Sequence, residues 1–211
     1  MGLIAVAGGS SKFKPVPDGV HLARCYSIID LGHQQSDYKG KITNLHKILI
    51  QFEVHGEDDE GNPLHTEKGE PMSISKTFTN SINEKANLRR DLESWRGKHF
   101  TQEELLGFTV KSVLGVWAMI SVMKTEGDNG KQYTVINSIT PVPKQMRANL
   151  PEGYNDLRLF DLDDFRQEDF DKVSDYYKEK IKLSDEYRKL KASDPVVKAG
   201  SFSDMESDIP F

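Results

Sequence analysis

A strand followed directly by one amphipathic helix, in residues 72–97, constrains the fold more than any other stretch of the chain. From Met72 to Thr79, apolar or long side chains alternate with serines and threonines. This period of two predicts a strand with unlike faces, and it places Lys76 and Phe78 on the same face. One strand, one long helix and then further strands suggest a small β-barrel that is closed at one end by its helix.

The helix itself has recognisable start and stop signals. Ser81 stands three residues before Glu84, a capping-box pattern, so we expect the helix to begin at Ser81. Gly97 is suited to end it in a left-handed conformation. Between them one apolar stripe recurs at helical spacing and predicts a buried face, formed by Leu88, Leu92 and Trp95.

Four further strands are predicted, at Val20 to Leu31, Leu45 to Val54, Val110 to Met123 and Gln132 to Ile139. Residues 33–43 and 55–69 read as polar loops, and the Asp-Asn-Gly sequence at 128–130 predicts a hairpin turn. In the fourth strand we expect a bend at Gly115 and these inward side chains: Val116, Ala118, Ile120 and Val122. Five strands with a helix between the third and the fourth is the order of the OB-fold, a five-stranded Greek-key barrel. A sandwich or another small barrel is the alternative.

Charge divides the chain into a nearly neutral body and an acidic C-terminal part. Residues 1–148 hold 18 Lys and Arg against 17 Asp and Glu, whereas residues 149–211 hold 10 against 16. Composition and periodicity together predict four segments: a flexible N-terminal arm (1–19), an OB-fold domain (20–148), an acidic amphipathic helical extension (149–193) and a disordered acidic tail (194–211). Within the extension, Val173 to Leu190 is expected to form one charged helix.

The sequence gives no catalytic or metal-binding constellation. Residues 8–12 lack the spacing of a phosphate-binding loop, and the six histidines show no paired ligand spacing. Cys25, the single cysteine, falls in a predicted strand, where burial is the better interpretation, and it excludes an internal disulfide. Acidic residues from Asp161 to Asp171 fit a solvated helix face better than a divalent-ion site. We therefore expect a protein that is not an enzyme and has no cofactor and no metal.

The last residues form an acidic peptide that ends in Pro-Phe. A phenyl ring and a terminal carboxylate suit a pocket with a basic rim, and the preceding charges steer the encounter. The partner-binding residues predicted on this basis are Asp204, Glu206, Asp208, Ile209, Pro210 and Phe211. This ending resembles the acidic tip of bacterial single-stranded DNA-binding proteins. The resemblance implies that the tip recruits host or phage enzymes of replication, recombination and repair.

The body resembles a family of phage single-stranded DNA-binding proteins with an OB-fold. The resemblance covers most of residues 12–145 and rests on three runs: Phe13-Lys14-Pro15; Ala23-Arg24-Cys25-Tyr26 with Ile29-Asp30-Leu31-Gly32; and Asn87-Leu88-Arg89-Arg90-Asp91-Leu92-Glu93-Ser94-Trp95-Arg96-Gly97. The last run is the most distinctive. The resemblance implies a protein that coats single-stranded DNA, and no residue contacts are carried over from that family.

The DNA-binding residues must be predicted from chemistry instead. A sequence-tolerant binder of single strands needs cations for phosphates and rings on which bases stack. The candidates are Lys12, Lys14, Tyr38, Lys41, Lys47, Lys76, Phe78, Trp117, Lys124, Lys131 and Tyr133. Core packing is the alternative for each ring. Arg89, Arg90 and Arg96 could instead pair with Asp91 and Glu93 on a solvated helix face.

These patterns predict a protein of the host-cell cytoplasm that binds single-stranded DNA and has no membrane partner. No apolar run approaches the length of a membrane span, and no signal peptide is recognisable. The alternative is an OB-fold adaptor that binds replication proteins and has little affinity for nucleic acid. The sequence leaves open whether Tyr176, Tyr177 and Ile181 pack within one subunit or in a homodimer.

Overall fold

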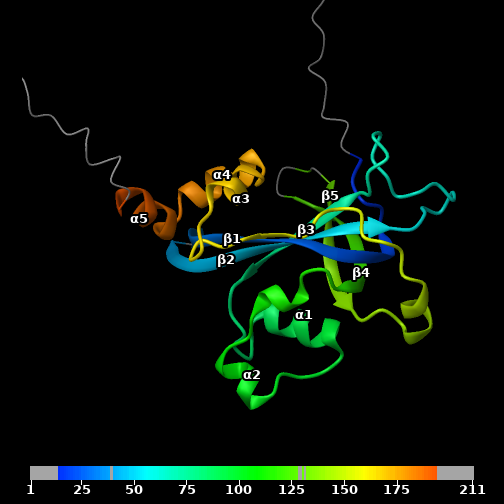
Figure 1. Ribbon diagram of the computed structural model, residues 1–211, viewed down its shortest axis with the longest axis horizontal. Helices are drawn as coiled ribbons and strands as arrows, with labels where there is room; N and C mark the ends of the chain where they lie inside the picture. The colour runs from blue at the N-terminus through cyan, green and yellow to red at the C-terminus, as the bar shows by residue number, and fades with distance from the viewer. Residues whose placement is uncertain (1–13, 39, 128–129, 131, 194–211) are drawn as a thin grey trace, which may run out of the picture. The chain divides into compact units, whose positions relative to one another are not determined.

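The computed structural model describes residues 14–38, 40–127, 130 and 132–193 (Figure 1). The fold is mainly β, as predicted, with an open antiparallel sheet and several helices. Six strands make the sheet, one more than predicted: β1 (Gly19–Tyr38), β2 (Lys41–His55), β3 (Ser73–Thr79), β4 (Trp117–Glu126), β5 (Gln132–Thr140) and β6 (Arg158–Phe160). The strand order is β3-β2-β1-β4-β5, and β6 pairs with β1. β3 and β5 are therefore the ends of this order.

Two compact units divide the chain. The first unit comprises Met1–Ile28 and Leu49–Leu159, and the second comprises Ile29–Ile48 and Phe160–Phe211. The long strands β1 and β2 contribute to both units.

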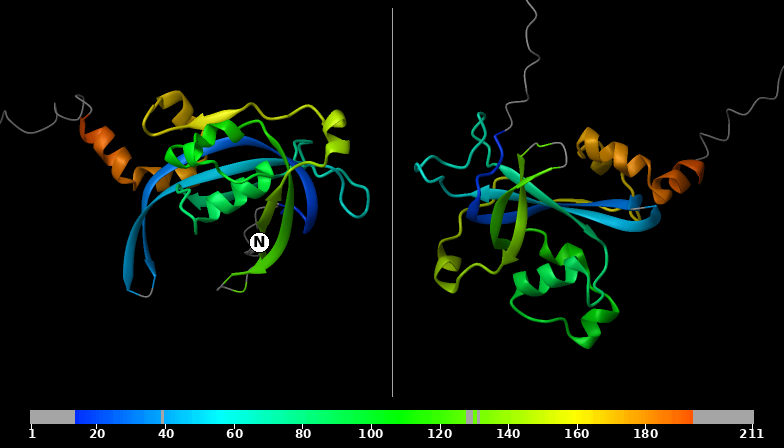
Figure 2. Two further views of the ribbon diagram at one scale, coloured as in Figure 1. Left: turned by 90° about the horizontal axis from the view of Figure 1, so that it is seen from below. Right: turned by 180° about the vertical axis from the view of Figure 1, so that it is seen from behind.

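In the first unit the helix α1 (Asn87–Arg96) packs against β3 and β5 and can be followed in Figure 2. Its predicted apolar stripe of Leu88, Leu92 and Trp95 is buried. The Trp95 ring lies 5.4 Å from that of Phe52, and its Nε1–H donates to the carbonyl of Trp117 at 3.1 Å. The indole N–H of this buried ring thus has a hydrogen-bond acceptor on β4, and the bond holds the helix on the sheet.

The ends of the helices follow the predicted signals only in part. Gly97 ends α1 with φ of 66°, as predicted, but α1 begins six residues later than predicted, after Ala86. Ser81 does not cap it, because its Oγ accepts the N–H of Asn83 in a local turn. The next helix, α2 (Gln102–Leu106), carries a complete capping box formed by Thr101 and Glu104.

The segment before β4 is not the continuous strand that was predicted. Residues Val110–Val113 form the 3-10 helix η1, and β4 begins only at Trp117, after Gly115 with φ of 83°. Ala118, Ile120 and Val122 are buried as expected, whereas Val116 is 41 % exposed and the prediction for it is wrong. A second 3-10 helix, η2 (Lys144–Asn149), follows β5.

The second unit combines the distal part of the β1–β2 hairpin with three helices. Residues 33–43 were predicted as a loop, but most of them belong to these two strands. The helices are α3 (Gln167–Asp171), α4 (Asp175–Lys182) and α5 (Asp185–Ser193), so the prediction of one continuous helix over 173–190 is wrong. Within this unit four rings pack against one another: Phe160, Phe165, Phe170 and Tyr187.

Among the residues described, no helix is both long enough and apolar enough to cross a bilayer.

Candidate nucleic-acid interface

A cleft of about 470 Å³ lies in the first unit between the edge strands β3 and β5. Each edge strand contributes three neighbouring residues to it, and β2 and the segment before β1 contribute the rest. Its lining is formed by Pro15, Val16, Gln51, Ser73, Ile74, Ser75, Gln132, Tyr133 and Thr134. None of these side chains is charged, and most of them are hydroxyls or amides that both donate and accept hydrogen bonds.

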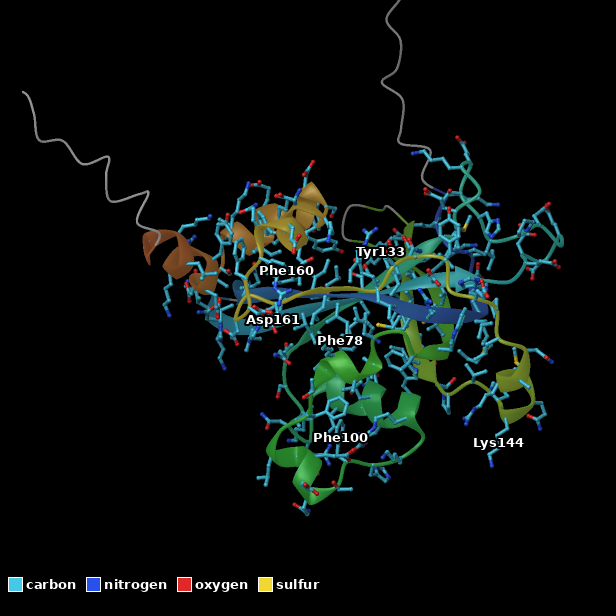
Figure 3. The ribbon with its side chains drawn as sticks, in the orientation of Figure 1. Phe78, Phe100, Tyr133, Lys144, Phe160 and Asp161 are labelled. Atoms are coloured by element: carbon cyan, nitrogen blue, oxygen red, sulfur yellow. The ribbon has the colours of Figure 1, made fainter. Side chains whose placement is uncertain are left out.

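Tyr133 is the aromatic side chain of this cleft and is labelled in Figure 3. It lies opposite Thr125 in the antiparallel pairing of β4 with β5. Its side chain is 49 % exposed, so one part of the ring contacts protein and another faces solvent. A half-exposed ring at the wall of a polar cleft has the geometry of a stacking platform.

The predicted DNA-binding lysines of the first unit differ in how closely they pair with carboxylates. Lys14 precedes the cleft residue Pro15, and its side chain is 70 % exposed, with a long ion pair of 3.8 Å to Asp58. Lys124 lies 2.8 Å from Asp18, and this contact raises the pKa of Lys124. Both pairs are exposed enough for phosphate to compete with the carboxylate.

Lys76 and Phe78 lie on the side of β3 that faces α1. Phe78 is 3 % exposed, so the prediction of an accessible ring there is wrong (Figure 3). Lys76 Nζ lies 2.6 Å from the carboxylate of Asp91, a buried residue of α1, and 5.4 Å from the Phe78 ring centre. The period-two pattern predicted the shared face correctly, but at Lys76 and Phe78 this face packs against α1.

Trp117 is half-buried rather than free on an outer face. Its ring meets that of His55 edge to face at 4.9 Å, and Arg24 lies opposite it in the pairing of β1 with β4. The Trp117 carbonyl accepts the hydrogen bond from Trp95 described above. The Trp117 ring therefore packs partly against neighbouring side chains. A smaller part of it is accessible to a base than of the Tyr133 ring.

The remaining candidates lie elsewhere. Lys41 is exposed in β2 and Lys47 is half-buried in it, and both belong to the second unit, as does Tyr38 at the end of β1. Lys12 and Lys131, like the predicted tail residues from Asp204 to Phe211, lie outside the described residues.

The arginines of α1 are engaged in ion pairs, the alternative that the sequence left open. Arg89 Nε lies 3.1 Å from Glu93 one helical turn away, and Arg90 Nε lies 3.2 Å from Asp91. Arg96 pairs with Glu104 and covers the ring of Phe100 at 4.6 Å. Glu93 is also held by the N–H of Phe100 and by His99, which lowers its pKa to about 2.

A buried carboxylate beside the cleft was not predicted. Glu53 follows the cleft residue Gln51 by two positions in β2, on the same face, and is completely buried. Its Oε1 accepts the N–H of Tyr154 at 3.0 Å, and its Oε2 accepts both the backbone N–H and the side-chain amide of Asn155 at 2.7 Å. Arg24 Nε lies 3.0 Å away as the countercharge. Burial would raise the pKa of Glu53, but these hydrogen bonds outweigh it and lower the pKa.

Glu53 thus fixes the segment around Tyr154 and Asn155 on the sheet. Arg24 also donates to the carbonyl of Asn155, and its guanidinium lies directly on Gly153, where any side chain would collide with it. Neither Glu53 nor the neutral cleft residues carried a sequence signal, because a charge in an amphipathic strand is normally read as solvent-facing.

Cys25 is buried, as predicted, and burial raises the pKa of its thiol to about 12. Over the described ranges, no group of three or more His, Cys, Asp or Glu residues is arranged to hold a metal ion. The absence of catalysis and of a cofactor stays a prediction. Comparison with known proteins gave no match to any family model or to any curated protein.

Proposed function

We propose that the chain is a phage-type single-stranded DNA-binding protein with an OB-like body that coats DNA without catalysis. The observation that carries the proposal is the cleft between β3 and β5, with uncharged polar walls and the half-exposed ring of Tyr133. A sequence-tolerant binder needs a stacking surface together with hydrogen-bonding groups that suit any base.

The charges around the cleft support an anionic ligand. The chain has a net charge of −5, and yet no carboxylate lines the cleft. Lys14 precedes one lining segment and Lys131 precedes another in the sequence. Of the two, Lys14 is described and exposed, so phosphates would meet a cation at the rim while the bases enter a neutral interior.

The strand arrangement supports the OB-like interpretation. The chain passes through three strands, then α1, then two strands, and α1 packs against the two strands that border the cleft. OB-folds are partly open barrels that bind oligonucleotides across a sheet face and adjoining loops. A single strand suits such a cleft better than a duplex, because only unpaired bases can leave their stack to reach Tyr133.

The test is fluorescence anisotropy of labelled oligo-dT titrated with protein at low and high salt, with a duplex of equal length as the control. We expect tight binding that prefers the single strand and weakens steeply as salt rises, through counterion release. Tyr133→Ala should weaken binding by about 1–3 kcal/mol, the usual value of one stacked base. Tyr176→Ala is the matched control, since Tyr176 is 64 % exposed but lies in the second unit.

Two results would contradict the proposal. Absence of binding at low salt by the full chain and by a chain lacking residues 203–211 would remove single-stranded DNA as the ligand. Equal effects of Tyr133→Ala and Tyr176→Ala would remove the cleft as its site.

A second candidate is the adaptor that binds replication proteins and hardly touches DNA. It is favoured by the ion pairs of Lys76, Lys124 and Lys14, because these three predicted DNA-binding lysines already have carboxylate partners. The two candidates share the proposed role of the C-terminal tip. Phe211→Ala should abolish capture of replication or repair enzymes in both cases, whereas salt-sensitive DNA binding is expected only from the first.

A further inference from the structure

A second hollow adjoins the cleft in the first unit, beside the segment that joins β2 to β3 (Figure 1). Its volume is about 430 Å³, close to that of the cleft. Lys14 lines this second hollow and the next residue, Pro15, lines the cleft. Met72 and Ser73 are divided between the two in the same way. Because neighbouring residues line both at two places, a strand of DNA that leaves the cleft across this border enters the second hollow.

The wall of the second hollow is a short hairpin that is anchored on the sheet. His65 and Pro71 pair across it in an isolated β-bridge, and the N–H of Met72 donates to the carbonyl of Leu64 at 2.8 Å. The carbonyl of Met72 in turn accepts the N–H of Val54 on β2 at 2.8 Å. Leu64 and Met72 are buried, whereas His65 is exposed. The buried base therefore holds the hairpin in place while its outer part presents side chains to the second hollow.

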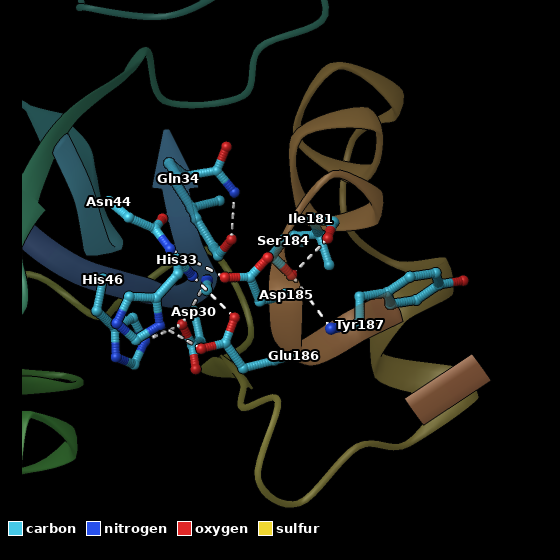
Figure 4. Close-up of polar contacts among 12 residues, drawn as sticks. Asp30, His33, Gln34, Asn44, His46, Ile181, Ser184, Asp185, Glu186 and Tyr187 are labelled. Atoms are coloured by element: carbon cyan, nitrogen blue, oxygen red, sulfur yellow. Dashed lines mark hydrogen bonds and ion pairs between the residues drawn. The ribbon is translucent and has the colours of Figure 1, made fainter. Parts of the chain in front are cut away.

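His65 supplies a free ring to this hollow. Among the described residues, its imidazole has no hydrogen-bond, ion-pair or ring partner. The other five histidines of the chain each have a hydrogen-bond partner, and Figure 4 shows two of these pairs, His33 with Glu186 and His46 with Asp30. An exposed imidazole can stack on an unpaired base. His65 is thus free to serve the second hollow as a stacking surface.

The charged side chains of the second hollow set it apart from the neutral cleft. Two carboxylates line it, those of Glu67 and Glu70, together with the cations of Lys14 and Lys68. Carboxylates repel phosphate, but they accept hydrogen bonds from the exocyclic amino groups of cytosine and adenine, which thymine lacks. The second hollow therefore suits the edge of such a base, and its cations suit the neighbouring phosphates.

We propose that the second hollow is a base-binding subsite of the same DNA-binding surface, in which one base stacks on His65 and donates its exocyclic amine to Glu67 or Glu70. Resting on the proposed function, this subsite adds a preference among bases to it. Lys14, at the border of the cleft and the second hollow, meets the phosphate that joins the two bound parts of the strand. The cleft then binds any base, and the subsite favours cytosine and adenine over thymine.

The test is fluorescence anisotropy of labelled oligo-dC and oligo-dT of equal length, titrated with the full chain. His65→Ala should weaken binding of oligo-dC by about 5–100-fold, the usual value of one stacked base. His99→Ala is the matched control, because His99 is an exposed histidine of the same unit that lines neither the cleft nor the second hollow. It should bind as the parent chain does.

The carboxylates are tested by the ratio of the two affinities. Glu67→Ala together with Glu70→Ala should lower the preference for oligo-dC over oligo-dT severalfold, because the amine loses its acceptors. Glu84→Ala together with Glu103→Ala changes the net charge by the same amount at exposed positions that line neither the cleft nor the second hollow. This control variant should leave the ratio unchanged.

Two results would overturn the subsite. One is equal affinity of His65→Ala and the parent chain for oligo-dC, and the other is an unchanged ratio in the variant that lacks Glu67 and Glu70. If Tyr133→Ala still weakens binding in either case, the proposed function stands without the second subsite. Absence of binding by the parent chain would contradict both.

Discussion

Replacing Glu53 by glutamine tests whether a buried carboxylate holds the segment after η2 on the sheet. Glutamine keeps the shape of the side chain but removes its charge, and its amide NH₂ would face N–H donors of Tyr154 or Asn155. Arg24, whose side chain is 14 % exposed, would then lack its countercharge. The side chain of Glu53 is completely buried, so water does not replace its lost contacts.

The expected loss is about 3–5 kcal/mol, the usual cost of removing one partner of a buried ion pair. For a chain of this size, a loss at the lower end of that range lowers the melting temperature by roughly 6–12 °C. The assay is urea and thermal unfolding followed by circular dichroism. Hydrogen exchange at the amides of Tyr154 and Asn155 should rise in parallel. Glu152→Gln, an exposed position in the same segment, is the matched control and should change stability by less than about 0.5 kcal/mol.

Acid titration gives a second readout of the same carboxylate. Because the pKa of Glu53 is lowered in the fold, its contribution is present above the ordinary value of 4.5 and is lost as pH falls below that value. The parent chain should therefore lose more stability than Glu53→Gln between neutral pH and acid pH. A loss of less than 1 kcal/mol in Glu53→Gln at neutral pH would refute the argument.

Three further predictions concern single positions. Trp95→Ala should cost about 3–5 kcal/mol in urea unfolding, since Trp95 is 3 % exposed and hydrogen-bonded; a loss under about 1 kcal/mol would contradict its place in the core. Gly32→Ala should release the α4–α5 corner and speed its hydrogen exchange, because Cβ collides with Ser184, and unchanged protection would show that the close contact does not exist. Cys25 should resist a thiol reagent at pH 8 in the native protein and react once unfolded; rapid native reaction would contradict its burial and its pKa of about 12.

Local sequence signals succeeded where neighbours along the chain decide the structure. The buried stripe of α1 and its left-handed end at Gly97 each depend on residues within one or two turns. The alternation in β4 predicted the burial of Ala118, Ile120 and Val122 for the same reason. The capping prediction failed at Ser81. Its hydroxyl accepts the backbone N–H of Asn83 in a local turn instead, and the helix begins later in the chain.

Periodicity and composition predict a mainly β chain with one long amphipathic helix and an acidic C-terminal part, because both are properties of short segments. The burial of Phe78, the anchoring role of Glu53 and the place of Tyr133 in a neutral cleft depend instead on tertiary contacts. The same holds for His33 and His46, which are 13 positions apart in sequence and adjacent in the hairpin. Burial, pairing and proximity depend on which distant segments meet, and no single stretch of sequence encodes that meeting.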